Sequence, residues 1–378
     1  MKAQPFIFML LLFLPGCIRN KPAPDSSYFG TGYGIKYAQG FEIKPEEGFT
    51  VLKVKNPWQQ AENVTYEYWL GDTSRKVSKS IPGCFIQVPV EKVVCLSSTF
   101  IGFIELLGKE QTITGISGKS YITSNSLLDK VAAGEVQDVG YDENLNYEKL
   151  VELQPDVVFL YGITGSVTSI MARLDEMGIK SAVIAEYLEE TPLARLEWIK
   201  YIAAFFNTTE EAQVKFDIVE KKYNSLAVMA AGATYKPTVL LGLPWSGTWY
   251  VSGGKSYMAG FLRDAGSHYL FDDLPYKDSQ PVSLEKVFEK SFQADFWLNA
   301  GDARIKDDIL MVDERFSQIK AFRDDAVYNN NNMVNPSGGN AYYEQGVVEP
   351  DIILADIISI LHPHLLPSHN RKYYRKLD

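Results

Sequence analysis

The sequence predicts an α/β protein of two lobes that are joined by a long helix and preceded by a β-rich extension. Three observations support this prediction. Short apolar strands alternate with amphipathic helices from about residue 92 onward, which is typical of βα units around a parallel sheet. A long stretch of helical periodicity interrupts this alternation, after which strands and helices alternate again. Each half also contains a helix that begins with Glu-Lys and leads into an apolar strand.

Length and composition agree with a globular protein of two domains. The chain has 378 residues, of which 46% are hydrophobic and 22% charged, so it can bury a sizeable core. Its formal net charge of −10 argues against a nucleic-acid-binding surface, which needs a basic footprint, and against electrostatic adhesion to anionic lipid. Aromatic residues make up 13%, and such a surplus can line a pocket as well as fill a core.

The first residues have the pattern of a secretion signal. A continuous apolar run over 6–14 follows a short basic start and is too short to span a bilayer, which requires about 20 residues. It ends in Leu14-Pro15-Gly16-Cys17, which resembles the bacterial lipobox, although Pro15 is atypical of that motif. We therefore predict a lipoprotein signal peptide over 1–17, lipidation of Cys17 and a polar tether over 18–27. The alternative is an ordinary signal peptide with a chance cysteine.

Residues 28–90 are expected to form a β-rich extension of the first lobe. Alternating and aromatic residues predict strands at 49–55 and 64–70, which are separated by a turn region. Cys84 and Cys95 could form one disulfide. Cys95 lies in an apolar run, however, where a buried free thiol is the simpler expectation.

The first α/β lobe is assigned to residues 91–195 and the connecting helices to 196–235. Strands of the lobe are predicted at 93–97, 156–161 and 181–185. Within the connection, Thr208-Thr-Glu-Glu211 has the sequence of a capping box. It marks the start of a helix of roughly 20 residues, which would be about 30 Å long.

The second α/β lobe is assigned to residues 236–378. Strands are predicted at 238–242 and 296–299, and an amphipathic helix at 351–361 is expected to end before Pro363. The Glu-Lys helix of each lobe leads through an Asp into an apolar strand. This internal repeat supports two lobes of related architecture.

Several segments in combination resemble the class III substrate-binding proteins of ABC importers, which bind iron chelates, haem and cobalamin. The resemblance covers residues 92 to 363 and rests on the segments 93–99, 140–158, 249–257, 264–266 and 348–363. It implies two Rossmann-like lobes joined by one long helix, with ligand held in the cleft between them. It also implies a monomer that is lipid-anchored to a bacterial membrane on its periplasmic side. Its partner would be a permease dimer with its ATPase subunits.

The resemblance assigns a docking role to two glutamates. Glu148 and Glu285 occupy the family positions at which one carboxylate on each lobe meets arginines of the permease. Two separated carboxylates would set the register on a symmetric partner and steer the encounter. The alternative is that each glutamate only favours the dipole in the first turn of its helix.

The ligand-binding cleft is expected at loops that follow the carboxyl ends of the strands. In the first lobe the candidates are Ser98, Thr99, Phe100, Tyr121 and Tyr161. In the second lobe they are Trp245, Trp249, Tyr250 and Tyr276. The alternative for each is packing within its own lobe. Three basic residues could also meet an anionic chelate, although solvated positions are expected for such side chains: Lys119, Lys255 and Arg263.

The sequence favours a binding protein over an enzyme and predicts no metal site of its own. All four histidines lie in the second half, whereas a metal in the cleft would draw ligands from both lobes. The motifs GxSxG, HExxH and the P-loop are absent from the sequence. No cofactor is expected, and iron or cobalt would belong to the transported ligand. We expect an iron complex, a siderophore or haem, with cobalamin as the alternative; a secreted α/β enzyme and a ligand sensor are alternatives of other classes.

Overall fold

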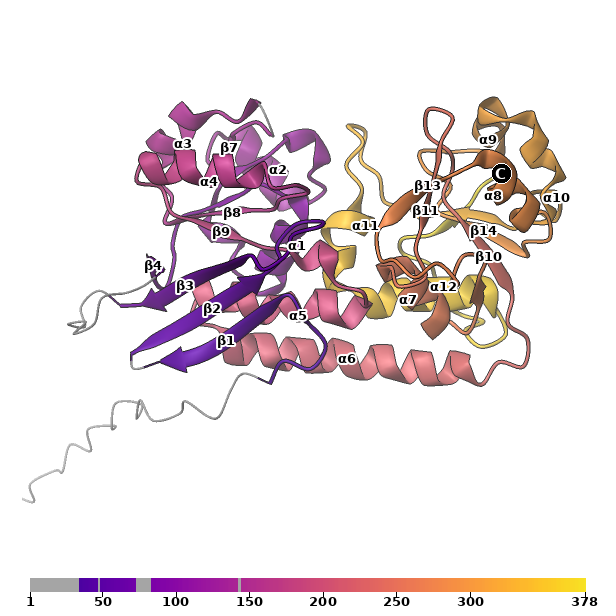
Figure 1. Cartoon of the computed structure of the whole chain (residues 1–378), viewed down its shortest axis with the longest axis horizontal. Coiled ribbons are helices and arrows are strands. Elements are labelled where there is room, and N and C mark those ends of the chain that lie inside the picture. Colours follow the sequence, from indigo (N-terminus) through magenta and orange to yellow (C-terminus); the bar gives the residue numbers. More distant parts are fainter. Residues whose placement is uncertain (1–33, 47, 73–82, 142–143) are drawn as a thin grey trace, which may run out of the picture.

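The computed structural model describes residues 34–46, 48–72, 83–141 and 144–378. The predicted signal peptide, Cys17 and the tether lie outside the described residues. Figure 1 shows two α/β lobes beside each other, with helix α6 (Thr209–Ala231) running along both. A small β-sheet covers part of the first lobe. This is the predicted architecture of two Rossmann-like lobes, a long helix and an N-terminal β extension.

The N-terminal extension is a four-stranded sheet in the order β1-β2-β3-β4. The two predicted strands are confirmed, whereas the outer strands were not predicted. The strands are β1 (Phe41–Glu46), β2 (Phe49–Lys55), β3 (Thr65–Gly71) and β4 (Cys84–Gln87). The Val183 N–H donates to the Tyr68 hydroxyl at 2.9 Å, which fixes this sheet to the first lobe. Cys84 and Cys95 are free thiols, so the possible disulfide between them is not formed.

The first lobe is built around a parallel sheet in the order β7-β6-β5-β8-β9. Its strands are β5 (Val93–Cys95), β6 (Ile113–Ile116), β7 (Gln137–Asp138), β8 (Val157–Leu160) and β9 (Ser181–Val183). Its helices are α1 (Ser98–Leu106), α2 (Asn125–Ala132), α3 (Tyr147–Leu153) and α4 (Val167–Glu176). The central strands are buried on both faces, as apolar runs in a parallel sheet should be.

The second lobe repeats this plan in the order β12-β10-β14-β15-β16, with the last strand antiparallel. Its strands are β10 (Thr238–Leu241), β12 (His268–Tyr269), β14 (Phe296–Leu298), β15 (Val327–Asn329) and β16 (Arg375–Lys376), with a separate antiparallel pair of β11 (Trp249–Ser252) and β13 (Ser279–Val282). Its helices are α7 (Tyr257–Asp264), α8 (Leu284–Ser291), α9 (Lys306–Val312), α10 (Lys320–Arg323), α11 (Ala341–Glu344) and α12 (Pro350–Leu361).

The helical connection differs in detail from the prediction. Helix α5 (Pro192–Phe205) begins earlier than expected and is buried along almost its whole length, so it belongs to the core of the first lobe. Helix α6 has 23 residues and would be about 34 Å long. The Thr208 side chain makes no capping hydrogen bond, and its buried hydroxyl has no partner among the described residues. The helix therefore starts where the capping-box sequence indicates, but without the capping box.

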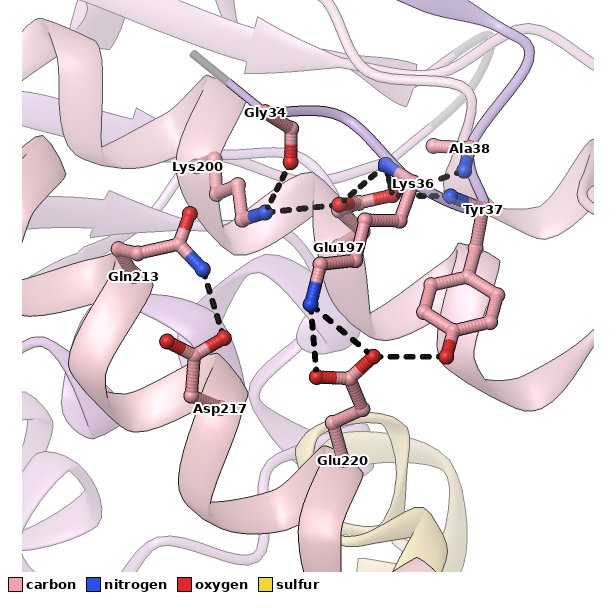
Figure 2. A network of polar contacts seen from close by, with 9 residues as sticks. All are labelled: Gly34, Lys36, Tyr37, Ala38, Glu197, Lys200, Gln213, Asp217 and Glu220. Carbon is pink, nitrogen blue, oxygen red and sulfur yellow. Dashed lines mark hydrogen bonds and ion pairs between the residues drawn. The ribbon is translucent and has the colours of Figure 1, made fainter. Parts of the chain in front are cut away.

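Residues 34–40 form a strap that is bound to α5 by the buried carboxylate of Glu197 and to α6 by the half-buried carboxylate of Glu220 (Figure 2). Glu197 accepts the backbone N–H groups of Lys36, Tyr37 and Ala38 at 2.8–2.9 Å, and the Lys200 ammonium lies 2.7 Å from it. Glu189 accepts the next two backbone N–H groups of the strap. Both Glu197 and Lys200 are buried, so this network is a structural element of the first lobe.

A second connection between the lobes is made by α11. The carboxylate of Glu344 accepts hydrogen bonds from Thr123 N, Thr123 Oγ1 and Ser124 N at 2.7–2.8 Å. Ser124 is the N-cap of α2, so a side chain from the C-terminal part of the chain satisfies a helix end in the first lobe. Because α6 and α11 both tie the lobes together, large hinge motions between them are disfavoured.

Candidate functional site

A cavity of about 610 Å³ lies in the cleft between the two lobes. This volume is in the range that is usual for small-molecule sites. The lining residues come from both lobes and are mostly polar: Ser98, Tyr121, Gly301, Asp302, Arg304, Asn330, Asn331, Val334, Gly338, Asn340 and Tyr343. We call this space the cleft cavity.

The cleft cavity is formed by loops that follow the carboxyl ends of parallel strands. Ser98 follows β5 and Tyr121 follows β6, both in the first lobe. The loop with Gly301 and Arg304 follows β14, and Asn330 follows β15. This is the position at which open α/β sheets bind their ligands.

An asparagine-rich segment after β15 holds the second-lobe wall of the cavity in place. The side-chain N–H groups of Asn329 donate to the carbonyls of Gly301 and Ala303 at 2.9 and 2.8 Å. Asn331 also donates to Ala303, at 2.9 Å. Carboxamides thus tie the loop after β14 to the loop after β15, which fixes the backbone around the ligand space.

Asn330 is the exception in this asparagine run. Its residue is only 4% exposed, and its side-chain Nδ2 is buried without a hydrogen-bond partner in the described part of the chain. Its backbone is occupied, because its N–H donates to Asn329 and its carbonyl accepts from Asn340. A buried donor without a partner costs about 1–3 kcal/mol, so its presence in the lining points to a function other than stability.

Tyr121 is presented to the cavity by a loop that is fixed from both lobes. The Asp138 carboxylate accepts the N–H groups of Gly118 and Lys119 at 3.1 Å. From the other side, Asn335 Nδ2 donates to the Ile122 carbonyl at 2.6 Å. The Tyr121 side chain remains 53% exposed and lies edge-on to Tyr141. A rigid loop with an exposed ring is suited to contact a ligand.

The structure brings two of the nine predicted ligand-binding residues, Ser98 and Tyr121, into the lining of the cleft cavity. Phe100 and Trp249 are fully buried in the core, so their predicted role in ligand binding is corrected to packing. Phe100 lies on the inner face of α1, and Trp249 stacks on Trp297 while its indole N–H donates to the Leu241 carbonyl.

The other five predicted residues do not line the cavity. Thr99, Tyr161 and Tyr276 are partly exposed outside it. Trp245 is 72% exposed and Tyr250 50% exposed. The Trp245 loop nevertheless borders the cleft, because Leu243 would contact a side chain at Gly301.

The three basic candidates also lie outside the cavity. Lys119 and Lys255 are exposed on loops of the first and second lobe. The Arg263 guanidinium donates to the Gly254 carbonyl at 2.9 Å. It therefore stabilises the turn before α7 instead of facing the ligand.

The sequence interpretation missed most of the second-lobe wall. It placed that wall in the aromatic loop after β10, whereas the wall is formed by the loops after β14 and β15. The sequence signal that could have found it is the run Asn329–Asn332, directly after a short apolar strand. Four consecutive carboxamides at a strand end are suited to fix loops around a polar site.

The two predicted docking glutamates occupy equivalent positions in the two lobes. Glu148 lies two residues after the N-cap Asn146 of α3, and Glu285 lies two residues after the N-cap Ser283 of α8. Both side chains are exposed. In Figure 1, α3 and α8 lie on different lobes, on the side of the molecule opposite α6. The geometry is that of two separated carboxylates, each at the positive end of a helix.

No group of three His, Cys, Asp or Glu side chains in the described ranges could hold a metal ion. His362 is buried, its ring lies 3.3 Å from the Gly266 carbonyl, and burial lowers its pKa. It is the C-cap residue of α12, in agreement with its interpretation as a helix end. None of the described helices is both long and apolar enough to cross a membrane.

Comparison with known proteins identifies the fold and the family. The family model described as periplasmic binding protein matches residues 93–332, which is more than half of the chain. Two uncharacterized lipoproteins of Methanocaldococcus jannaschii are 29% and 28% identical over 78% and 91% of this chain. These alignments cover 70% and 86% of the relatives.

Solved structures show the same fold at lower identity. A possible iron-binding (periplasmic solute-binding) protein of Staphylococcus epidermidis has a TM-score of 0.57 and 17% identity. The match covers 72% of this chain and 99% of that protein. The periplasmic haem-binding protein HutB of Vibrio cholerae has a TM-score of 0.54 and 22% identity, and the match covers 70% and 98% of the two chains. Members of the family are binding proteins for transport and not enzymes. This chain belongs to the periplasmic binding protein family, the substrate-binding components of ABC transporters.

Proposed function

We propose that this protein captures an iron complex in the cleft cavity and delivers it to the permease of an ABC importer. The observation that carries the proposal is the cavity itself, which both lobes line at the carboxyl ends of their strands. Its lining is rich in carboxamides and hydroxyls and contains no His, Cys or Met. Such a lining suits a complex whose own donors already fill the coordination sphere of the metal. The proposed iron cargo is in keeping with the solved relatives that are described as binding iron or haem.

Within this proposal, a hydrophilic chelate such as a siderophore fits the lining better than haem. The aliphatic part of the lining is Val334 alone, whereas a haem plane needs extensive apolar contact. Tyr121 and Tyr343 are the lining residues that could ligate haem iron. Haem is therefore the second candidate ligand, and its binding would require one of these two hydroxyls to ligate the iron.

A tryptophan-fluorescence titration with a ferric siderophore, haemin and cyanocobalamin tests the proposal. Trp245 is exposed in the loop after β10, and Leu243 of this loop lies beside Gly301 in the cavity wall, so an occupied cleft should change its emission. Saturable quenching by an iron complex at micromolar concentrations is expected, and the variant Trp245→Phe should lose most of the signal while it retains affinity by calorimetry. Saturation by cyanocobalamin alone would contradict the iron assignment, and no response to any of the three would contradict ligand capture.

We further propose that Glu148 and Glu285 dock the loaded protein on the permease dimer. Their equivalent helix positions in the two lobes and their exposure support this role. The double variant Glu148→Arg with Glu285→Arg should abolish iron uptake by cells that depend on this importer and leave ligand affinity unchanged. The matched control is Glu152→Arg with Glu289→Arg, one turn further along the same helices, which should retain uptake. Normal uptake by the docking variant would contradict the role.

The predicted lipid anchor at Cys17 completes the proposal. The two archaeal relatives are described as lipoproteins, which supports an anchor on this chain. Membrane attachment would keep the captured ligand near the importer. Mass spectrometry of the mature protein should find an N-terminal cysteine with lipid attached, and an unmodified N-terminus at another residue would contradict the anchor.

A further inference from the structure

A second cavity of about 490 Å³ adjoins the cleft cavity. The two spaces share Arg304, Asn331 and Val334 as a common wall. The remaining lining residues of the second space are Asn332, Asn335, Pro336 and Arg375. We call this second space the side chamber.

The side chamber is basic in an otherwise acidic protein. The charged side chains that line the two cavities are Asp302, Arg304 and Arg375, a net charge of +1 from these three, in a chain with a formal net charge of −10. Asp302 lines the cleft cavity, so the side chamber itself contains only the two arginines as charged groups. A local excess of positive charge attracts an anionic ligand group.

Arg304 differs from all other arginines in the described part of the chain. Each of the others donates to a carboxylate, a carbonyl or a carboxamide oxygen, or lies over an aromatic ring: Arg173, Arg195, Arg263, Arg315, Arg323, Arg371 and Arg375. The Arg304 guanidinium has no hydrogen bond or ion pair to any described residue. It is exposed and lies at the wall that the two cavities share.

The backbone of Arg304 is nevertheless held firmly. Its N–H donates to the Asp308 carboxylate at 2.7 Å, and its carbonyl accepts from Arg375 Nη2 at 2.5 Å. Arg375 Nε donates to Asn331 Oδ1 at 2.9 Å, so the second arginine is oriented by the cavity wall. The backbone of Arg304 is therefore fixed, while its exposed guanidinium acts on Asp308 through its charge and makes no hydrogen bond or ion pair to a described residue, so it is available to an anion.

We propose that the side chamber binds a carboxylate arm of the ligand, with Arg304 as its main partner. The proposal rests on the proposed function, because the metal-bearing part of the same ligand would occupy the cleft cavity. A guanidinium forms two parallel hydrogen bonds with a carboxylate, and an ammonium cannot reproduce this geometry. The ligand is thus a chelate with a pendent carboxylate. Its carboxylate arm would lie in the side chamber and its metal in the cleft cavity.

Two pairs of matched ligands test this inference. Ferrioxamine B carries an ammonium arm, and its N-succinylated derivative carries a carboxylate arm with the same iron coordination. Haemin carries free carboxylates, and its dimethyl ester does not. In whichever scaffold binds, the carboxylate form should bind at least about tenfold more tightly in calorimetry.

The variant Arg304→Gln should remove this preference and leave the urea midpoint unchanged, because the guanidinium has no partner to lose. Arg173→Gln, an equal change of charge on an exposed helix of the first lobe, should retain the full preference. Equal affinity for both members of a pair, or an undiminished preference in Arg304→Gln, would overturn the side-chamber assignment and leave the proposed function standing. Failure of both scaffolds to bind in any form would overturn the proposed function and this inference together.

Discussion

The strap network (residues 34–40 with Glu189, Glu197 and Lys200) and the wall of the cleft cavity differ in whether their polar groups have hydrogen-bond partners. In the strap network, Glu197 and Glu189 are buried and accept five successive backbone N–H groups. In the cleft wall, the Nδ2 of Asn330 is equally buried but has no partner among the described residues, and the exposed Arg304 guanidinium has no hydrogen bond or ion pair to any of them. Satisfied polar groups hold the fold, whereas unsatisfied groups reduce stability and are retained where a ligand can complete them.

The largest effect is expected for a variant that breaks the strap network, in which all the carboxylates have partners. Glu197→Gln replaces a carboxylate that serves three backbone donors and leaves the buried Lys200 ammonium without its counter-charge. Breaking a buried ion pair of this kind costs about 3–5 kcal/mol. Urea unfolding should show this loss of free energy, while affinity of the remaining folded protein for its ligand stays the same.

A control for this variant is available in the same network. Glu220→Gln removes the partially exposed ion pair with Lys36, and an amide oxygen replaces the carboxylate that accepts the hydrogen bond from the Tyr37 hydroxyl. Because this site is partly solvated, its loss should cost about 1 kcal/mol or less. Equal effects of the two variants would show that burial does not determine the strength of the network.

The next prediction concerns Asn330 in the wall of the cleft cavity. Asn330→Leu replaces an unpartnered buried amide by an apolar group of similar size, so the free energy of unfolding should change by less than about 1 kcal/mol or increase. Ligand affinity should fall by about tenfold, because Asn330 lines the cavity and leucine removes a polar group from its wall. A large loss of stability with unchanged affinity would mean that Asn330 has a structural role after all.

The stability of the connection between the lobes should depend on pH through Glu344. Burial raises the pKa of Glu344, against the opposing hydrogen bonds from Thr123 and Ser124. A raised pKa in the folded state means that protonation favours folding. This contribution is complete below the ordinary pKa of a glutamate and is lost as the pH rises through the raised value. The free energy of unfolding of the wild type, minus that of Glu344→Gln, should therefore increase as the pH falls from above the raised pKa to the ordinary value of about 4.5. A difference independent of pH would contradict the raised pKa.

The smallest effect expected is that of a reducing agent. Cys84 and Cys95 are free, and burial raises the pKa of both thiols, so neither should be reactive. Dithiothreitol should leave the thermal midpoint of the purified domain unchanged. A midpoint that falls on reduction would show a disulfide that the structure does not contain.

The elements that could be predicted from sequence are those with a strong local pattern. Five strands, the long helix α6 and the helix α12 each show an apolar run or helical periodicity, and all are confirmed; the strands are β5, β8, β9, β10 and β14. The short strands β7, β12 and β16 have only two residues each. Their pairing is decided by neighbours far along the chain, which leaves no local pattern to detect.

The cleft was harder to predict for a related reason. Aromatic residues are common both in cores and in pockets, so their type alone does not show which they occupy. Phe100 and Trp249 are fully buried in the core. Most residues that line the cavity from the second lobe are Asn, Asp and Gly, which are also typical of ordinary loops. Their proximity to Ser98 and Tyr121 depends on the packing of α11 against the first lobe, which involves residues more than 200 positions apart.

Anomalous diffraction at the iron edge, from crystals of the protein loaded with its ferric complex, tests the central claim most directly. A single iron peak is expected inside the cleft cavity, between Tyr121 of the first lobe and Asn340 of the second. An iron peak in the separate cavity of about 280 Å³ beside Glu189, or on the outer surface, would contradict capture of an iron complex between the lobes.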